Sequence, residues 1–446
     1  MLFFLITTLS IIVIIWSKFL LKKWINHLSV YCIIWSVLIL LYEWKLLPYV
    51  DIIPLAWFFI AASFLSFLFG TLTFITARNL FPRNKILSRE SDSTIPIFID
   101  KGKTVKYALL IFSLISLYAG IQNWMVLIHK YGSIPAVFLN AADIYKEITR
   151  GGIKGVVPFI SNFGYVAIFF SGIYTAFKGK FTLLTFLPFI GIILKELANV
   201  GRAGMLIALL EFLFSFILTR HLLNDDSSQR FKFSKKNAII ASSILIIFFV
   251  ASASFVRISR GSFEHFNGAS KLLREQKNNL IFSPSLYLYL SSDVGVLSQY
   301  LKSDRERTGF GQNTFLTVYH ILDRLDVLKR PSDYQKGYFI PMWTNTGTYI
   351  RELHADFGIL GPLIGPYLFG FFITLLWFKF FEKKSFIVLT ILVYLFLVVG
   401  FSFLVMITRS SYWSISQFLI ILIIPLLERI ASIVHGKSIE RQSGRT

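Results

Sequence analysis

Long apolar runs dominate the chain and alternate with shorter polar segments. A helix needs about 20 apolar residues to cross the hydrocarbon core of a bilayer. Eleven runs meet that length when tilt is allowed for, at about 1–17, 28–43, 55–77, 106–128, 157–177, 181–200, 203–219, 237–255, 357–379, 385–407 and 412–429. The pattern predicts an all-α polytopic membrane protein of about 11 transmembrane helices, with residues 1–446 as a single integral membrane domain.

The composition agrees with this class. Of the 446 residues, 55% are hydrophobic and 15% are charged, whereas about 25% of a typical soluble domain is charged. The single cysteine, Cys32, excludes an internal disulfide and a cysteine-based metal cluster. The seven histidines show no H-x-x-x-H spacing. We therefore expect neither a metal site nor a cofactor.

The net charge of +21 is explained by membrane orientation rather than by nucleic acid. With the N-terminus outside, the inside segments hold 24 Lys and Arg against 7 in the short outside loops. Long translocated loops are largely exempt from this rule. The count predicts a cytoplasmic loop at 78–105, outside loops at 129–156 and 256–356, and a cytoplasmic C-terminus. The first run has no basic n-region, which indicates a retained span.

The long outside loop contains an amphipathic segment, QNTFLTVYHILDRLDVLKR. Its apolar stripe consists of Phe315, Val318, Leu322, Leu325 and Leu328. A helix with such a stripe is expected to lie along the outer membrane surface or to roof a cavity.

Three arginines are candidates for binding an anion at the outer surface. The stretch from Phe181 to Thr219 leaves no room for a loop between two spans, which predicts a tight turn near Gly201–Gly204 with Arg202 beside it. Lys195 and Glu196 precede this turn and are expected to neutralise each other. Arg257 and Arg260 lie three apart, so a helix would present both on one face. Arginine suits bidentate phosphate binding, although snorkelling to lipid headgroups is the alternative for all three.

The segment from Trp343 to Phe372, WTNTGTYIRELHADFGILGPLIGPYLFGFF, is the richest in candidate chemistry. Glu352, His354 and Asp356 are candidate general bases for a sugar hydroxyl, and Arg351 could stabilise a departing phosphate. Interfacial capping is the alternative. Gly361 and Gly365, with Gly358 and Gly370 extending the pattern, are interpreted as close helix packing.

Three stretches resemble the Wzy-type O-antigen and oligosaccharide repeat-unit polymerases, which are integral membrane glycosyltransferases of bacteria. They are GRAGMLIALLEF, NTFLTVYHIL and TNTGTYIRELHADFGILGPLIG. The order of about a dozen helices with one dominant outside loop late in the chain is similar too. The resemblance covers residues 190 to 372 in detail and the rest by hydropathy.

The resemblance implies a location in the bacterial inner membrane and a substrate of oligosaccharide repeat units on undecaprenyl pyrophosphate. The growing chain is transferred to the next lipid-linked unit in the periplasm without nucleotide sugar or metal. The family's periplasmic arginines correspond by position to Arg202, Arg257, Arg260 and Arg351. A polysaccharide chain-length regulator is an expected partner, besides membrane lipid, and nucleic acid is not. Independently of the resemblance, the aromatic side chains of the long loop are suited to stacking on sugar faces, namely Tyr287, Tyr289, Tyr338 and Trp343.

Two other functions stay open on the sequence. An O-antigen ligase shares the architecture and the donor but attaches the chain to lipid A–core. A lipid-linked oligosaccharide flippase or another transporter is a second alternative, although no internal hydropathy repeat supports it.

Overall fold

The computed structural model describes residues 2–80, 102–141, 143–144, 147, 159–201, 203–225, 243, 284–303, 307–329, 331, 335–340 and 343–443. Ten of the eleven predicted runs coincide with helices, and the run 237–255 lies outside the described residues, apart from residue 243. These helices are α1 (Leu2–Leu21), α2 (His27–Glu43), α3 (Pro54–Leu80), α5 (Lys103–Tyr131), α8 (Phe163–Lys178), α9 (Leu183–Ala198), α10 (Ala203–Asp225), α17 (Leu360–Lys383), α18 (Phe386–Phe401) and α19 (Ser411–Ser443).

Seven helical segments in the described part of the chain are long and apolar enough to cross a membrane. They are α1, α3, α5, α10, α17, α19 and the segment Ile160–Lys178, in which the short 3₁₀ turn η2 (Ile160–Asn162) runs into α8. The apolar helices α2 and α18 are shorter. The protein is therefore an all-α polytopic membrane protein, as the hydropathy predicts.

The chain forms two compact units. Unit 1 comprises Met1–Lys85, Glu264–Phe378 and Leu395–Ser414, and unit 2 comprises Ile86–Phe263, Lys379–Tyr394 and Ile415–Thr446. Each unit is thus assembled from segments that are far apart in the sequence.

In unit 1, α3 and α17 pack with their backbones in close approach. A Cβ on Gly70 would lie 2.0 Å from the carbonyl oxygen of Tyr367, and one on Gly370 would lie 2.2 Å from that of Phe67. Small residues permit this approach, which lets hydroxyls bond across the helices. Ser63 donates to the carbonyl of Pro362 at 2.8 Å. Of the four glycines interpreted as packing residues, Gly370 is confirmed at this crossing. Gly361 closely approaches the backbone of Leu353 in a different contact, and Gly358 has a positive φ of 63° instead.

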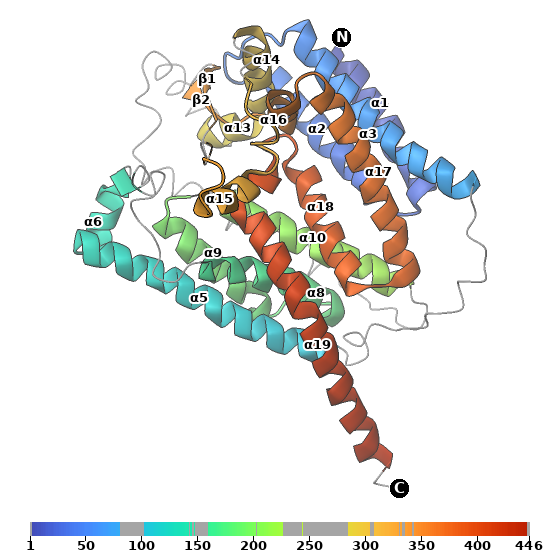
Figure 1. Ribbon diagram of the computed structural model, residues 1–446, viewed down its shortest axis with the longest axis vertical. Coiled ribbons are helices and arrows are strands. Elements are labelled where there is room, and N and C mark those ends of the chain that lie inside the picture. The colour runs from blue at the N-terminus through green and yellow to red at the C-terminus, as the bar shows by residue number, and fades with distance from the viewer. Residues whose placement is uncertain are drawn as a thin grey trace. The chain divides into compact units, whose positions relative to one another are not determined.

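Unit 1 also contains the elements that follow from the long predicted loop. They are α13 (Pro284–Ser291), α14 (Asp293–Ser303), α15 (Leu316–Arg324), α16 (Tyr349–Phe357) and a short antiparallel hairpin of β1 (Tyr338–Phe339) and β2 (Trp343–Thr344). Figure 1 labels these elements in yellow and orange. Of the predicted apolar stripe, only Val318 and Leu322 lie within α15, because the helix ends at Arg324. Val318 is exposed and Leu322 is half-buried, and Phe315, Leu325 and Leu328 are exposed beside the helix.

Unit 2 contains α5, α8, α9 and α10, which pack against one another (Figure 1). α8 is buried from Gly164 to Phe177, and it packs against α5, α9 and α10. The predicted tight turn is confirmed, since α9 ends at Ala198 and α10 begins at Ala203.

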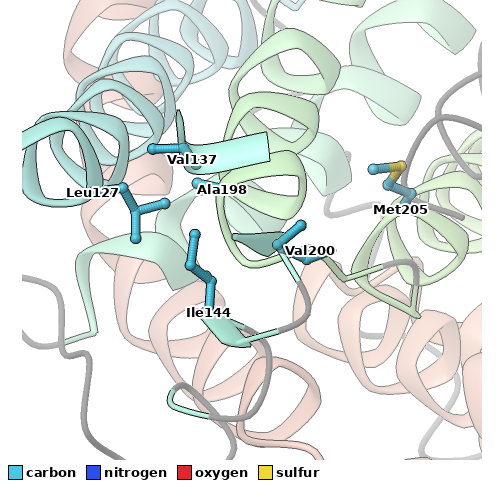
Figure 2. Packing of buried hydrophobic residues seen from close by; sticks show 7 residues of the cluster. Leu127, Val137, Ile144, Ala198, Val200 and Met205 are labelled. Atoms are coloured by element: carbon cyan, nitrogen blue, oxygen red, sulfur yellow. The ribbon is translucent and has the colours of Figure 1, made fainter. Parts of the chain in front are cut away.

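Part of the predicted outside loop 129–156 packs onto that turn. Val137 of α6 (Ile134–Leu139) and Ile144 join a buried cluster with Leu127, Ala198 and Val200 (Figure 2). Burial of these apolar side chains attaches the loop to the α9–α10 turn.

Two predicted spans differ in their ends. The run 385–407 is helical only to Phe401, and the chain then turns through the 3₁₀ turn η4 (Ile407–Arg409). The charged segment before the span at 357–379 does not continue into it, because Gly358 ends α16 with a positive φ of 63°. α16 is thus a separate helix that precedes α17.

Candidate functional site

α16 carries four of the candidate residues and is buried almost throughout. Every residue from Tyr349 to Asp356 is buried, including Arg351, Glu352, His354 and Asp356. Buried charges are costly unless they find partners. The partners of these four side chains therefore decide what each can do.

Glu352 is fully buried and forms an ion pair with Arg409 of η4, at 2.6 Å between Oε1 and Nη1. Gln335 Nε2 donates to the same oxygen, and the backbone N–H of Met406 donates to the other. Burial raises the pKa of Glu352, while Arg409 and the Met406 N–H oppose that rise by stabilising the anion. The Glu352 carboxylate of α16 therefore binds the turn after α18 through Arg409 and Met406.

Arg351 lies between two tyrosine rings. Its guanidinium carbon is 5.1 Å from the ring centre of Tyr338 and 5.5 Å from that of Tyr300. Its hydrogen bonds go to the backbone carbonyls of Lys336 at 2.6 Å and Asn345 at 3.3 Å. Burial lowers the pKa of Arg351, but an arginine stays charged.

No carboxylate within the described residues forms a salt bridge with Arg351, in contrast to Arg409. A desolvated guanidinium over aromatic faces is stabilised by about 2 kcal/mol through cation–π attraction. Within the described residues, Arg351 is therefore held by tyrosine rings and backbone carbonyls rather than by a salt bridge to an acid.

His354 shares a hydrogen bond with Tyr300, at 2.9 Å between Nδ1 and the phenol oxygen. The imidazole also packs edge-on against Phe59 of α3 at 5.3 Å between ring centres. Tyr300 thereby contacts both Arg351 and His354, so α14 orders two of the candidate side chains.

Asp356 anchors the segment before α15. Its two oxygens accept from the hydroxyls of Thr308 at 2.6 Å and Thr314 at 2.8 Å, and from the backbone N–H groups of Asn313 and Thr314. The side-chain amide of Asn313 adds a bond of 2.9 Å. With its lone pairs engaged in this way, the carboxylate organises a loop, which leaves little capacity to accept a proton from a substrate.

The predicted aromatic residues lie on the hairpin. Tyr338 is 7% exposed beneath Arg351, whereas Trp343 is 58% exposed on the opposite strand. Trp343 is thus the member of the pair that is placed to contact a soluble group.

The described part of unit 2 shows the charges near the predicted turn. Lys195 and Glu196 are both buried and form an ion pair of 3.0 Å, as the sequence suggested. Lys195 also donates to the hydroxyl of Tyr165 at 3.3 Å. Arg202, Arg257 and Arg260 lie outside the described residues.

Two residues were not singled out from the sequence. Arg409 follows the apolar run of α18 and gives no local sign that it pairs with Glu352. Asp293 stands at the first position of α14 and resembles an ordinary acidic residue of a first helical turn. Within the described residues no group of three or more His, Cys, Asp or Glu side chains could hold a metal ion.

The fold and the buried polar cluster on α16 define a polytopic α-helical membrane protein with an elaborate loop domain. No protein-family model matches the chain, no curated protein matches it, and no solved structure matches it.

Proposed function

We propose that this protein is a glycosyltransferase that polymerises undecaprenyl-pyrophosphate-linked oligosaccharide repeat units into a surface polysaccharide such as O-antigen. It transfers the growing chain to the next lipid-linked unit at the periplasmic face of the bacterial inner membrane. The observation that carries the proposal is Arg351, a buried guanidinium without a carboxylate partner in the described residues, in a loop domain next to membrane helices.

The chemistry of the donor supports this assignment. The leaving group is a lipid pyrophosphate, and a fixed positive charge in a desolvated setting stabilises the charge that develops as it departs. The guanidinium also has donors that match phosphate oxygens. The exposed Trp343 on the neighbouring hairpin offers an aromatic face for a sugar ring.

The proposal includes a topology of eleven spans with the N-terminus in the periplasm and the C-terminus in the cytoplasm. Ten of them correspond to helices, and the eleventh is the predicted run 237–255. The loop domain between the eighth and ninth spans then lies in the periplasm, where the flipped donor is available.

The experiment is deletion of the gene, with complementation by wild type, Arg351→Ala or Arg351→Lys, followed by gel analysis of the surface polysaccharide. Wild type should restore a ladder, and both variants should yield core with a single repeat unit, because lysine lacks the planar guanidinium. Arg324→Ala, an exposed arginine on α15, is the matched control and should restore the ladder.

Other outcomes contradict the polymerase. Loss of every repeat unit from the core in the deletion strain would indicate a ligase or a flippase. Accumulation of lipid-linked polymer in that strain would then identify the ligase. A full polysaccharide ladder in both Arg351 variants would show that Arg351 is not required for polymerisation.

A further inference from the structure

Asp293, the first residue of α14, has a buried carboxyl group whose two oxygens lack a hydrogen-bond partner of normal geometry among the described residues. The residue is 2% exposed. The hydroxyl of Thr346 faces it, but neither carboxylate oxygen has a hydrogen-bond partner of normal geometry among the described residues. A buried carboxyl in this condition costs stability. It therefore calls for an explanation other than folding.

α14 carries Asp293 on the face that packs against the Arg351 site. Asp293, Val296 and Tyr300 are spaced by three and four positions and so share a helical face. A Cβ on Gly347 would lie 3.1 Å from Val296 Cγ1 and 3.2 Å from Arg351 Nη1. Tyr300 lies at the other end of the face, against Arg351.

The segment Asn345–Thr348 therefore lies between Asp293, whose carboxylate oxygens lack a hydrogen-bond partner of normal geometry, and Arg351, which forms no salt bridge among the described residues. Along this segment exposure falls from Asn345, which is exposed, through Thr346, which is half-buried, to Gly347, which is buried. Thr346 is thus half-buried, and its hydroxyl lies beside Asp293.

Among the described residues, Asp293 has phenols nearby and forms no salt bridge with a cation. Tyr49, from the loop after α2, is close enough for its pKa to be raised by Asp293. Tyr42 of α2 packs its hydroxyl against Gly295. Arg351 is the cation on the facing helix α16, and its electrostatic neighbours are Tyr338, Glu352, Tyr300 and Arg409. Burial raises the pKa of Asp293 well above its ordinary value, while Thr346 lowers it.

The carboxylates of Glu352 and Asp356 are occupied by hydrogen bonds that hold other segments in place. Glu352 is engaged by Arg409, Gln335 and Met406. Asp356 is engaged by the 308–314 segment. Of the three acids, Asp293 has the most free acceptor capacity.

We propose that Asp293 is the general base of the glycosyl transfer, and that Thr346 positions it. The proposal rests on the proposed polymerase function. The acceptor hydroxyl oxygen attacks the anomeric carbon of the donor sugar and its proton passes to the Asp293 carboxylate. The bond between that carbon and the pyrophosphate oxygen breaks, and undecaprenyl pyrophosphate leaves with the electron pair, its charge stabilised by Arg351.

The test uses the full-length protein in lipid nanodiscs with a lipid-linked repeat unit, and it measures release of undecaprenyl pyrophosphate across pH. Asp293→Asn should lower kcat by about 10²–10⁴-fold with KM little changed, the usual contribution of a general base. In the wild-type protein kcat should fall at acid pH as Asp293 is protonated. The residual kcat of Asp293→Asn should not show this fall. A kcat within threefold of wild type with the acid fall retained would overturn the proposal.

A second variant keeps the test decisive if Asp293→Asn unfolds. Thr346→Val removes the hydroxyl that lowers the pKa of Asp293, so the acid fall of kcat should move to higher pH. An unmoved profile in a folded Thr346→Val protein overturns the role of Asp293. Failure of the wild-type protein to extend lipid-linked units would instead overturn the polymerase function, so the two failures are distinguishable.

Discussion

Arg409 donates a hydrogen bond of 2.6 Å from Nη1 to Oε1 of Glu352, across 57 positions of sequence. The pair joins the turn after α18 to α16, and the Met406 N–H bonds the second oxygen of the same carboxylate. The Glu352 side chain is fully buried and that of Arg409 is 9% exposed, so the guanidinium compensates a carboxylate that is removed from water.

Arg409→Ala should destabilise the protein by about 3–5 kcal/mol, because it leaves Glu352 buried without its cation. The double variant Glu352→Gln/Arg409→Gln should be less destabilised than the sum of the two single changes. The measurement is the thermal unfolding midpoint of each purified variant in detergent. Additive losses would show that the pair is not coupled.

Asp356→Asn should loosen the segment 308–314 without unfolding the protein. The amide offers one acceptor oxygen where the carboxylate accepts on two, so the N–H groups of Asn313 and Thr314 compete for it. Hydrogen exchange should become faster at these amides by at least tenfold. Asp326→Asn, at an exposed position with φ 55° that asparagine tolerates, is the control and should leave them unchanged.

Gly70→Ala should prevent α3 and α17 from closing, because the new methyl would lie 2.0 Å from a backbone oxygen that cannot move alone. The expected loss is about 1–3 kcal/mol. Gly365→Ala is the matched control, since its methyl meets only the side chain of Leu353 at 3.0 Å. Equal thermal midpoints for the two variants would contradict the close crossing.

The raised pKa of Asp293 predicts a pH-dependent stability. Below about pH 3.9, the ordinary pKa of aspartate, both the folded and the unfolded chain bind the proton and the group has no effect. Above it the unfolded chain loses the proton first, so the contribution of Asp293 to the stability of the folded state falls as pH rises towards the folded-state pKa.

Asp293→Asn carries no titrating group, so its thermal midpoint should equal that of wild type at acid pH and exceed it at neutral pH. The measurement is the unfolding midpoint of both proteins between pH 4 and 8. A difference that does not change with pH would mean that Asp293 titrates normally in the folded protein.

The exposed apolar side chains on and beside α15 should contact lipid. Val318 is 50% exposed on the stripe, and Lys329 is exposed in the chain that follows α15. A nitroxide on Val318→Cys, in a Cys32→Ser background, should be more accessible to oxygen than to a water-soluble nickel complex. Lys329→Cys should show the opposite preference, and equal profiles would contradict a membrane-facing helix.

The sequence by itself determined the class of the protein and the positions of most helices. A run of about 20 apolar residues has few stable outcomes other than a membrane helix, because every backbone polar group must be paired within the segment. The same arithmetic located the turn near Gly201, since two spans filled the available length. The packing role of the glycines in α17 also followed from local spacing.

Only the tertiary structure decided which partners the polar residues of the loop domain contact. Arg351, Glu352, His354 and Asp356 are neighbours in sequence, but α16 directs them to separate partners. Asn313 bonds Asp356 across 43 residues, Tyr300 bonds His354 across 54, and Arg409 bonds Glu352 across 57. In the sequence, Asp293 resembles an ordinary acidic residue in the first turn of a helix, and only the structure shows that it is buried. Burial and partnership depend on contacts between distant segments, which no local pattern of residues encodes.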